Sequence, residues 1–266
     1  MKTLQRLTIV LFVIMLLVFL GVRYYDRAFV DRTAPVIQCD SQILPVSVHD
    51  DGDSLLKGVT ARDDVDGDLT DQVVIQGVSQ LITADTAKVT YVVFDSSNNM
   101  GTCTRIIQYT DYEKPRLILT QPLVFQTGEE VDVLSLLQAE DRLDGDISGN
   151  IRITSQSITN TQEGIYNITV QVMNSMGDVE SLPLRVIVSN SAASRKLLTL
   201  KAYITYLETG DRFDPVSYIT AVNGGNISDV TIDSDVDTQE PGNYCVTYTY
   251  TVQNRVYTAF LTVVVR

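Results

Sequence analysis

One order of features occurs three times along the chain, at intervals of about 80 residues. Each copy opens with a short apolar segment, passes a polar turn and an alanine, enters a Gly-bearing polar loop and closes with two segments of alternating polarity. The copies occupy residues 34–111, 115–190 and 196–266. Because a segment of this length can hold a small domain with its own core, we expect three domains in tandem.

The closing half of each copy alternates between apolar and polar side chains. The apolar or aromatic positions are Val89, Tyr91 and Val93, then Ile168, Val170 and Val172, and finally Val246, Tyr248 and Tyr250. A period of two indicates strands with one buried face, and the abundant Val, Ile, Thr and Tyr suit such strands. With about six or seven short strands in each copy, the sequence predicts an all-β fold of three tandem Ig-like β-sandwich domains.

An apolar run over residues 7–22 precedes the repeats. Its length of about 16 residues is close to the roughly 17 that suffice to cross a bilayer, and flanking Lys and Arg side chains can extend toward the headgroups. Arg23, Tyr24 and Tyr25 follow the run and offer no small-residue cleavage site. We therefore expect one N-terminal transmembrane helix that acts as an uncleaved signal anchor, with a cleaved signal peptide and a buried core helix as the alternatives.

The anchor sets the expected order along the chain. This order is a cytoplasmic N-terminus at residues 1–6, the transmembrane signal anchor at 7–22, a juxtamembrane linker at 23–33, and Ig-like domains at 34–111, 115–190 and 196–266. Positive charges flank both ends of the anchor and do not set its orientation. A strand-rich chain behind one export-type segment favours a single-pass protein of the cell membrane with its bulk extracytoplasmic. Small polar residues at 189–194 predict a flexible joint.

Composition and motifs argue against several classes of function. The net charge is −13 and no cluster of Lys and Arg is present, which argues against a nucleic-acid partner. His49 is the only histidine and the cysteines form no C-x-x-C pair, so the sequence has no framework for zinc or for a Cys–His nucleophile. It also has no G-x-S-x-G, H-E-x-x-H or P-loop motif. We expect no enzymatic activity and, calcium apart, no cofactor.

Aspartates concentrate in the polar loops of the first two copies, at residues 63–70 and 141–148. Calcium binds six to eight oxygens, and the candidate ligands in the first loop are Asp64, Asp66 and Asp68. The spacing of an EF-hand is absent from this loop. The preferred interpretation is a turn in which Asp side chains accept hydrogen bonds from nearby backbone N–H groups and Gly supplies a positive φ.

The cysteines allow one disulfide. Cys39 lies just beyond the opening strand of the first copy and Cys103 begins its closing strand, and first and last strands are often neighbours in such sandwiches. A bond between them closes a loop of about 60 residues and contributes roughly 3–4 kcal/mol on the chain-entropy model. Two independent thiols are the alternative. Cys245 is expected to stay single.

Three stretches of the first copy carry a family resemblance: residues 33–37, 59–70 and 91–99. They resemble the bacterial surface-protein Ig-like domain, whose motif runs APVI, then A-x-D-x-x-DGDLT, then Y-x-V-x-D-S-x-G-N. The second copy matches moderately and ends in Asn174-Ser175-Met176-Gly177, and the third has lost the aspartates of the loop. The resemblance implies a sandwich fold and a cell-surface location, mainly in Gram-positive bacteria, and it implies no reaction.

Together these features predict an adhesive or partner-binding protein of the cell envelope, with a protein or glycan as partner. The alternatives are a structural spacer or stalk, and an accessory subunit of an envelope assembly. The third copy carries many tyrosines, at Tyr203, Tyr206, Tyr218, Tyr244, Tyr248, Tyr250 and Tyr257. Because tyrosine is favoured at interfaces, we expect the recognition surface there, unless these rings simply fill a small core.

Overall fold

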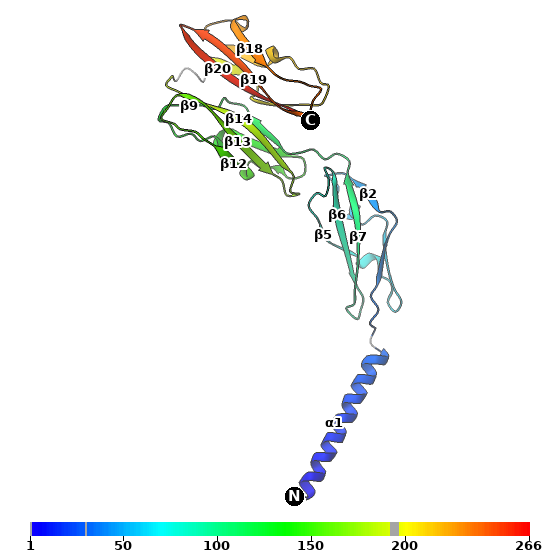
Figure 1. Ribbon diagram of the computed structural model, residues 1–266. Coiled ribbons are helices and arrows are strands. Elements are labelled where there is room, and N and C mark those ends of the chain that lie inside the picture. Colours follow the sequence, from blue (N-terminus) through cyan, green and yellow to red (C-terminus); the bar gives the residue numbers. More distant parts are fainter. Residues whose placement is uncertain (1, 30, 192–196) are drawn as a thin grey trace. The chain divides into compact units, whose positions relative to one another are not determined.

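The computed structural model describes residues 2–29, 31–191 and 197–266 (Figure 1). The chain forms two compact units, Met1–Thr110 and Asp111–Arg266. The expected joint at residues 189–194 falls partly on residues 192–196, which lie outside the described residues.

The first unit begins with helix α1 (Lys2–Phe29). Its apolar stretch Gln5–Tyr25, which contains the expected anchor at 7–22, has 21 residues and is fully exposed in this structure. At about 1.5 Å per residue this stretch spans about 31 Å, close to the roughly 30 Å of a bilayer's hydrocarbon core. The helix is therefore long and apolar enough to cross a membrane, a criterion that a signal sequence also meets.

The rest of the first unit is a sandwich of two sheets. One sheet has the strand order β1 (Val36–Cys39), β3 (Val59–Asp63), β4 (Gly67–Asp68), and the other has the order β2 (Ile43–Val46), β7 (Met100–Tyr109), β6 (Thr86–Phe94), β5 (Val74–Val78). Strand β2 pairs in parallel with β7, and all other neighbours are antiparallel. The opening segment thus contributes one strand to each sheet. Two short helices, α2 (Gly52–Leu55) and η1 (Thr70–Gln72), lie in its connections.

The second unit repeats this topology twice, but the smaller sheet of the third copy has two described strands where the first two copies have three. The second copy pairs β11 (Gly145–Asp146), β10 (Leu137–Asp141) and β8 (Arg116–Leu119) in one sheet, and β12 (Arg152–Gln156), β13 (Gly164–Met173), β14 (Val179–Ser189) and β9 (Val124–Gln126) in the other. The third copy pairs β15 (Leu198–Leu200) with β17 (Ile219–Val222), and β16 (Ile204–Leu207), β20 (Arg255–Val265), β19 (Gly242–Val252) and β18 (Val230–Ser234). In both copies the opening strand of the larger sheet is parallel to the closing strand.

Short 3₁₀ turns occupy several connections of the second unit. They are η2 (Leu134–Leu136), η3 (Ser148–Asn150), η5 (Pro215–Tyr218) and η6 (Ile227–Asp229). The alternating segments form strands as expected, and Val89, Tyr91, Val170 and Tyr248 are fully buried. The expected all-β fold of Ig-like sandwiches behind one N-terminal helix is confirmed.

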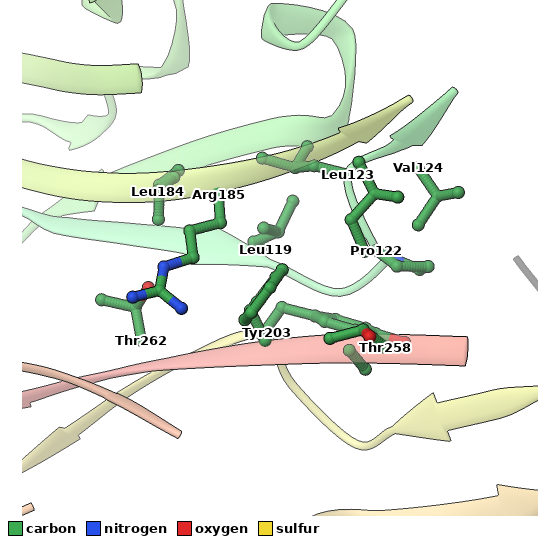
Figure 2. A pocket seen from close by; sticks show the side chains of 12 residues that line it. Leu119, Pro122, Leu123, Val124, Leu184, Arg185, Tyr203, Thr258 and Thr262 are labelled. Atoms are coloured by element: carbon green, nitrogen blue, oxygen red, sulfur yellow. The ribbon is translucent and has the colours of Figure 1, made fainter. Parts of the chain in front are cut away.

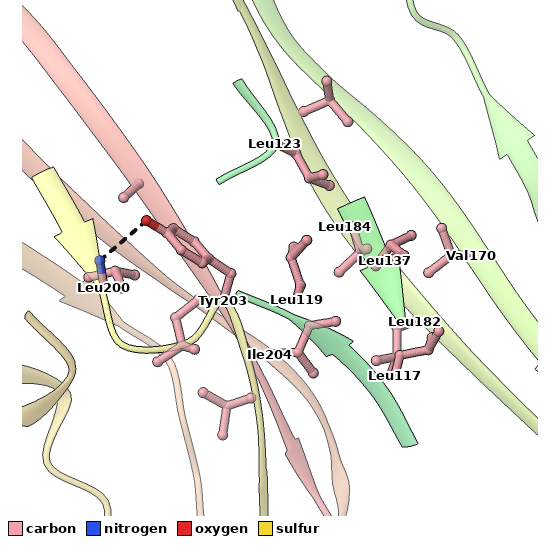
Figure 3. Packing of buried hydrophobic residues seen from close by; sticks show 14 of the residues in the cluster. Leu117, Leu119, Leu123, Leu137, Val170, Leu182, Leu184, Leu200, Tyr203 and Ile204 are labelled. Atoms are coloured by element: carbon pink, nitrogen blue, oxygen red, sulfur yellow. Dashed lines mark hydrogen bonds between the residues drawn. The ribbon is translucent and has the colours of Figure 1, made fainter. Parts of the chain in front are cut away.

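The second and third sandwiches share one hydrophobic core, which runs without a break through the second unit (Figure 3). At the junction, Tyr203 lies against Leu119, and its hydroxyl accepts a hydrogen bond from the N–H of Leu200 at 3.2 Å. The N–H of Tyr203 donates to the carbonyl of Leu119 at 2.9 Å, which joins the two sandwiches through the backbone. These contacts make the two sandwiches one body.

Most tyrosines of the third copy lie in its core. Five are buried: Tyr203, Tyr218, Tyr248, Tyr250 and Tyr257. The remaining two, Tyr206 and Tyr244, are half-buried. The alternative expectation, that these rings fill a small core, therefore holds for the five buried tyrosines. Physically, a sandwich of about 70 residues has little core volume, and large rings at alternate strand positions fill it.

Candidate functional site

The Gly-bearing loop of the first sandwich is a turn organised by Asp63, at the end of β3. Its Oδ1 accepts hydrogen bonds from the N–H groups of Val65 at 2.8 Å and Asp66 at 3.0 Å. Gly67 follows with φ +79°, a conformation that favours glycine, and the chain returns as β4. The turn has the form expected from the sequence. Its hydrogen bonds hold Asp63 and Asp66 in place.

Four carboxylates meet at this turn. One oxygen from each of Asp31, Asp63, Asp66 and Asp95 lies within 4.8 Å of the others. Asp63 and Asp95 are only 4% and 6% exposed. Two unit charges at about 4.8 Å repel by roughly 3 kcal/mol at an effective dielectric constant of about 20. The arrangement therefore concentrates negative charge at a partly buried point.

Backbone hydrogen bonds hold the loops that carry these carboxylates. Asp95 follows β6, and its Oδ1 accepts from the N–H groups of Ser97 at 2.9 Å and Asn99 at 2.8 Å. The Nδ2 of Asn99 donates to Asp95 Oδ2 at 2.7 Å and to the backbone carbonyl of Asp31 at 3.2 Å. Asp66 Oδ2 accepts from the N–H of Ser96 at 2.9 Å. The chain ahead of β1 is thereby tied to the loop after β6.

Asp31 presents an oxygen without a partner. Its Oδ1 accepts from the hydroxyl of Thr33 at 2.6 Å and from the N–H of Thr33 at 2.9 Å, and these bonds lower the pKa of Asp31. Its Oδ2 is buried and has no hydrogen-bond partner. Among the described residues, none of the four carboxylates forms an ion pair with Lys or Arg. The cluster thus holds an ionised carboxylate with unused coordinating capacity.

Of the three calcium candidates named from the sequence, only Asp66 belongs to this cluster. Asp64 is exposed to solvent. Asp68 accepts from the N–H of Thr70 at 3.0 Å, and the hydrogen bonds from Thr70 lower its pKa. Asp31, Asp63 and Asp95 were not identified by the sequence reasoning. Asp63 and Asp95 are motif residues at the ends of two strands, β3 and β6, that finish at the same end of the sandwich, and this was the usable signal.

The second sandwich builds the same turns with a different outcome. Asp141 Oδ1 accepts from the N–H groups of Leu143 and Asp144, and Asp144 Oδ2 accepts from the N–H of Ser175 at 2.6 Å. The residue that corresponds to Asp95 is Asn174, whose Oδ1 accepts from the N–H of Asp178 at 2.9 Å. One carboxylate of the first sandwich is therefore an amide in the second.

That amide closes the corresponding space with hydrogen bonds. Asn174 Nδ2 donates to Asp141 Oδ2 at 3.0 Å and to the hydroxyl of Tyr112 at 2.8 Å. The Tyr112 hydroxyl donates to Asp178 at 2.8 Å, and burial, followed by this bond, raises the pKa of Tyr112. The polar groups around Asn174 in the second sandwich therefore satisfy one another without an ion.

The cysteine pair also lies in the first unit, and neither cysteine belongs to the acidic cluster. Cys39 Sγ and Cys103 Sγ are 3.5 Å apart, and both residues are thiols in this structure. Burial, followed by the contact with Cys103, raises the pKa of Cys39 to about 11. A disulfide requires the sulfur atoms to approach to about 2.05 Å, so the bond between these neighbours stays a prediction. Cys245 is also a free thiol.

The junction inside the second unit contains a small cavity (Figure 2). Its volume is about 20 Å³, and Leu119, Leu184, Tyr203 and Phe260 are among the side chains that line it. This volume accommodates about one water molecule, whereas small-molecule sites have volumes of roughly 300–1,000 Å³. The cavity is a packing feature of the junction.

Comparisons with known proteins give one relative in sequence. No protein-family model matches the chain. Over 249 residues the chain is 26% identical to the pesticidal crystal protein Cry22Aa of Bacillus thuringiensis. The matched region covers 87% of this chain and 32% of that protein. The chain thus spans about a third of the length of this relative.

Solved structures with similar folds are distant. A structure of the CBM51-2 and INT domains of Clostridium perfringens ZmpB in complex with GlcNAc is 21% identical, with a TM-score of 0.24 over 56% of this chain and 26% of that one. Drosophila N-cadherin EC1-3 is 14% identical, with a TM-score of 0.32 over 87% of this chain and 99% of that one. Neither superposes closely enough to transfer a ligand or a role to this chain.

Proposed function

We propose that the chain is a membrane-anchored, extracytoplasmic Ig-like repeat protein that acts in adhesion or partner binding at the cell envelope. The observation that supports this most directly is the apolar helical stretch Gln5–Tyr25, none of which is buried by the protein, followed by β-sandwich repeats. An apolar surface of this size is unfavourable in water, and a bilayer removes it from water. The sandwiches then stand on one side of the membrane, where a protein or glycan partner reaches them.

The proposal includes membership of the bacterial surface-protein Ig-like family and no catalytic activity. Support for the family comes from the roles of its motif residues. Thr70 Oγ1 accepts from the N–H of Ala61 at 3.1 Å, and Ser148 Oγ accepts from the N–H of Ala139 at 2.9 Å. The alanine and the hydroxyl residue of the motif are thus paired in the first two sandwiches, which explains why they occur together.

The partner-binding proposal is tested by capture on intact cells. The full chain and a chain ended after Thr110 are compared by cross-linking and pull-down, because the boundary at Thr110 leaves the first unit whole. We expect the shortened chain to stay in the membrane and to lose the captured partner. Equal capture by the two chains would move binding to the first unit, and capture by neither would contradict partner binding.

A spacer or stalk is the second candidate, and the shared core of the second and third sandwiches favours it. Two sandwiches packed as one body transmit position better than two joined by a free linker. If spacing is the function, an unrelated rigid domain of similar length in place of residues 111–266 restores it. If partner binding is the function, this replacement does not restore capture.

A further inference from the structure

The acidic cluster of the first sandwich, formed by Asp31, Asp63, Asp66 and Asp95, has the properties of a cation site. We propose that it binds one Ca²⁺ ion. Two observations point to a ligand beyond the acidity itself. Asp31 Oδ2 is a buried oxygen without a hydrogen-bond partner, and Asp63, at 4% exposure, receives no hydrogen bond at its Oδ2 from any residue in the described ranges.

The second sandwich provides an internal comparison. There the amide of Asn174 replaces the carboxylate of Asp95, and its Nδ2 donates to Asp141 Oδ2 at 3.0 Å. Asp141 corresponds to Asp63, so the second sandwich supplies a hydrogen-bond donor to the oxygen that lacks one in the first. A cation is the partner that satisfies the same oxygen when both residues are carboxylates.

The ligand set selects the type of cation. All four ligands are carboxylate oxygens, which suit hard cations, and the absence of His and Cys from this set disfavours zinc and copper. Oxygens bound to Ca²⁺ at about 2.3–2.6 Å can lie up to roughly 5 Å apart, whereas those bound to Mg²⁺ at about 2.0–2.1 Å can lie only roughly 4 Å apart. The four oxygens, all within 4.8 Å of one another, fit inside the coordination sphere of Ca²⁺. Mg²⁺ usually keeps several waters and binds one or two carboxylates, so a set of four carboxylates suits it less well.

Bound calcium has a structural consequence in the first unit. Asp31 lies two residues beyond the end of α1 at Phe29, whereas Asp63 ends β3 and Asp95 follows β6. An ion shared by these carboxylates fastens the segment that leaves α1 to the loops of the first sandwich. The expected dissociation constant is on the order of 10⁻⁴–10⁻³ M, as in extracellular calcium-binding modules. This value rests on the proposed extracytoplasmic location, whereas the proposal that the cluster binds calcium does not.

Calcium titration of the purified full chain in detergent tests the proposal. After chelator treatment, isothermal titration calorimetry with CaCl₂ is expected to show one site. Calcium at about ten times the dissociation constant is expected to raise the unfolding midpoint of the first unit by about 4 °C or more. No heat and no shift up to about ten times the expected dissociation constant would overturn the proposal, and so would equal affinity for MgCl₂.

Three variants locate the site. Asp95→Asn is decisive because the second sandwich already carries Asn at this position in the same turn. It is expected to weaken calcium binding at least about tenfold. In chelator it removes a repelling carboxylate but also loses the acceptor of the 2.7 Å hydrogen bond from Asn99 Nδ2, so its unfolding is measured alongside its affinity. Asp66→Asn is expected to weaken binding similarly. Asp64→Asn removes the same charge from the same loop and is expected to bind as the wild-type chain does.

Each other outcome contradicts the site. Wild-type affinity in Asp95→Asn would exclude the cluster as the place of binding. Equal weakening by Asp64→Asn and Asp95→Asn would indicate diffuse attraction by an acidic surface. If Asp95→Asn fails to fold in chelator, Asp66→Asn decides in its place, and its unchanged affinity would overturn the proposal. None of these measurements depends on the membrane orientation, so the proposed function and this site fail separately.

Discussion

Tyr206 shows how one side chain joins the second and third sandwiches. Its hydroxyl accepts from the N–H of Leu117 at 2.7 Å and lies 3.3 Å from the carbonyl of the same residue, to which it donates. The guanidinium of Arg266 lies 4.4 Å from the centre of its ring and also donates to the carbonyl of Pro115 at 2.9 Å. Burial, the largest cause, raises the pKa of Tyr206 to about 12.

The substitution Tyr206→Phe is therefore expected to have two effects. At neutral pH it lowers the free energy of unfolding of the second unit by about 1–2 kcal/mol, because Leu117 loses its hydroxyl partner. The folded state keeps the Tyr206 proton to about pH 12, whereas an unfolded tyrosine loses it near pH ~10. The contribution of Tyr206 to the free energy of unfolding is therefore fully present below about pH 10 and is lost as the pH rises toward about 12. Between these pH values the Tyr206→Phe chain is expected to lose less stability than the wild-type chain.

Urea unfolding at neutral pH and at about pH 11 measures both effects. Tyr166→Phe is the control, because its hydroxyl bonds to the carbonyl of Gln162 at an exposed site. That control is expected to change stability by less than about 0.5 kcal/mol. A Tyr206→Phe chain with wild-type stability at both pH values would show that the hydroxyl contributes nothing to the junction.

The alternation of apolar residues predicted the strands and their buried faces, but it did not predict how buried polar residues are paired. Arg105 is 2% exposed in β7, where it donates to the carbonyls of Leu55 and Lys57 and to the hydroxyl of Tyr91. The two carbonyl groups lie 50 and 48 residues away in sequence, and no local pattern identifies them. The acidic cluster was missed for the same reason, since Asp31 and Asp95 meet only after folding.

At the scale of elements, the opening segment of each copy is divided between two sheets. In the first sandwich β1 joins the smaller sheet and β2 pairs in parallel with β7 of the larger one. The repeat order indicated strands at these places, but turn residues between short segments do not specify which sheet each strand joins. The thiols of Cys39 in β1 and Cys103 in β7 therefore face each other across the two sheets.

Oxidation of this thiol pair is expected to join the two sheets covalently. A disulfide between Cys39 and Cys103 would raise the free energy of unfolding of the first unit by roughly 3–4 kcal/mol. Because burial raises the pKa of Cys39 to about 11, we expect slow alkylation at neutral pH and faster reaction under alkaline conditions. Mass spectrometry of a Cys245→Ser chain before and after mild oxidation measures bond formation. Persistent labelling of both thiols after oxidation would contradict it.

At the scale of the whole molecule, the chain has two folded units rather than three independent ones. The repeat predicted three sandwiches, but it did not predict that two of them share a core. The residues that join them, such as Leu119 and Tyr203, are apolar or aromatic, as core residues of a single sandwich also are. Sequence alone does not distinguish the interior of a sandwich from the surface between two.

Unfolding of the second unit is therefore expected to be one transition. Leu119→Ala, at a residue that is 3% exposed, is expected to destabilise both sandwiches of this unit together by about 2–5 kcal/mol. Val89→Ala in the first unit, at a residue that is fully buried, is the control and leaves that transition unchanged. Calorimetry of the full chain measures both. Separate transitions for the second and third sandwiches would contradict the shared core.

The proposed function depends most on the membrane anchor and on the side of the membrane where the sandwiches lie. The direct measurement treats intact cells with a membrane-impermeant amine reagent and maps the modified lysines in the membrane fraction by mass spectrometry. Lys57, Lys88 and Lys201 are exposed on the sandwiches and are expected to react, whereas Lys2 is expected to be present and to react only after permeabilisation. Reaction of Lys2 on intact cells with the other three lysines protected would contradict the proposed orientation. A membrane-bound chain that lacks residues 1–22 would contradict the anchor.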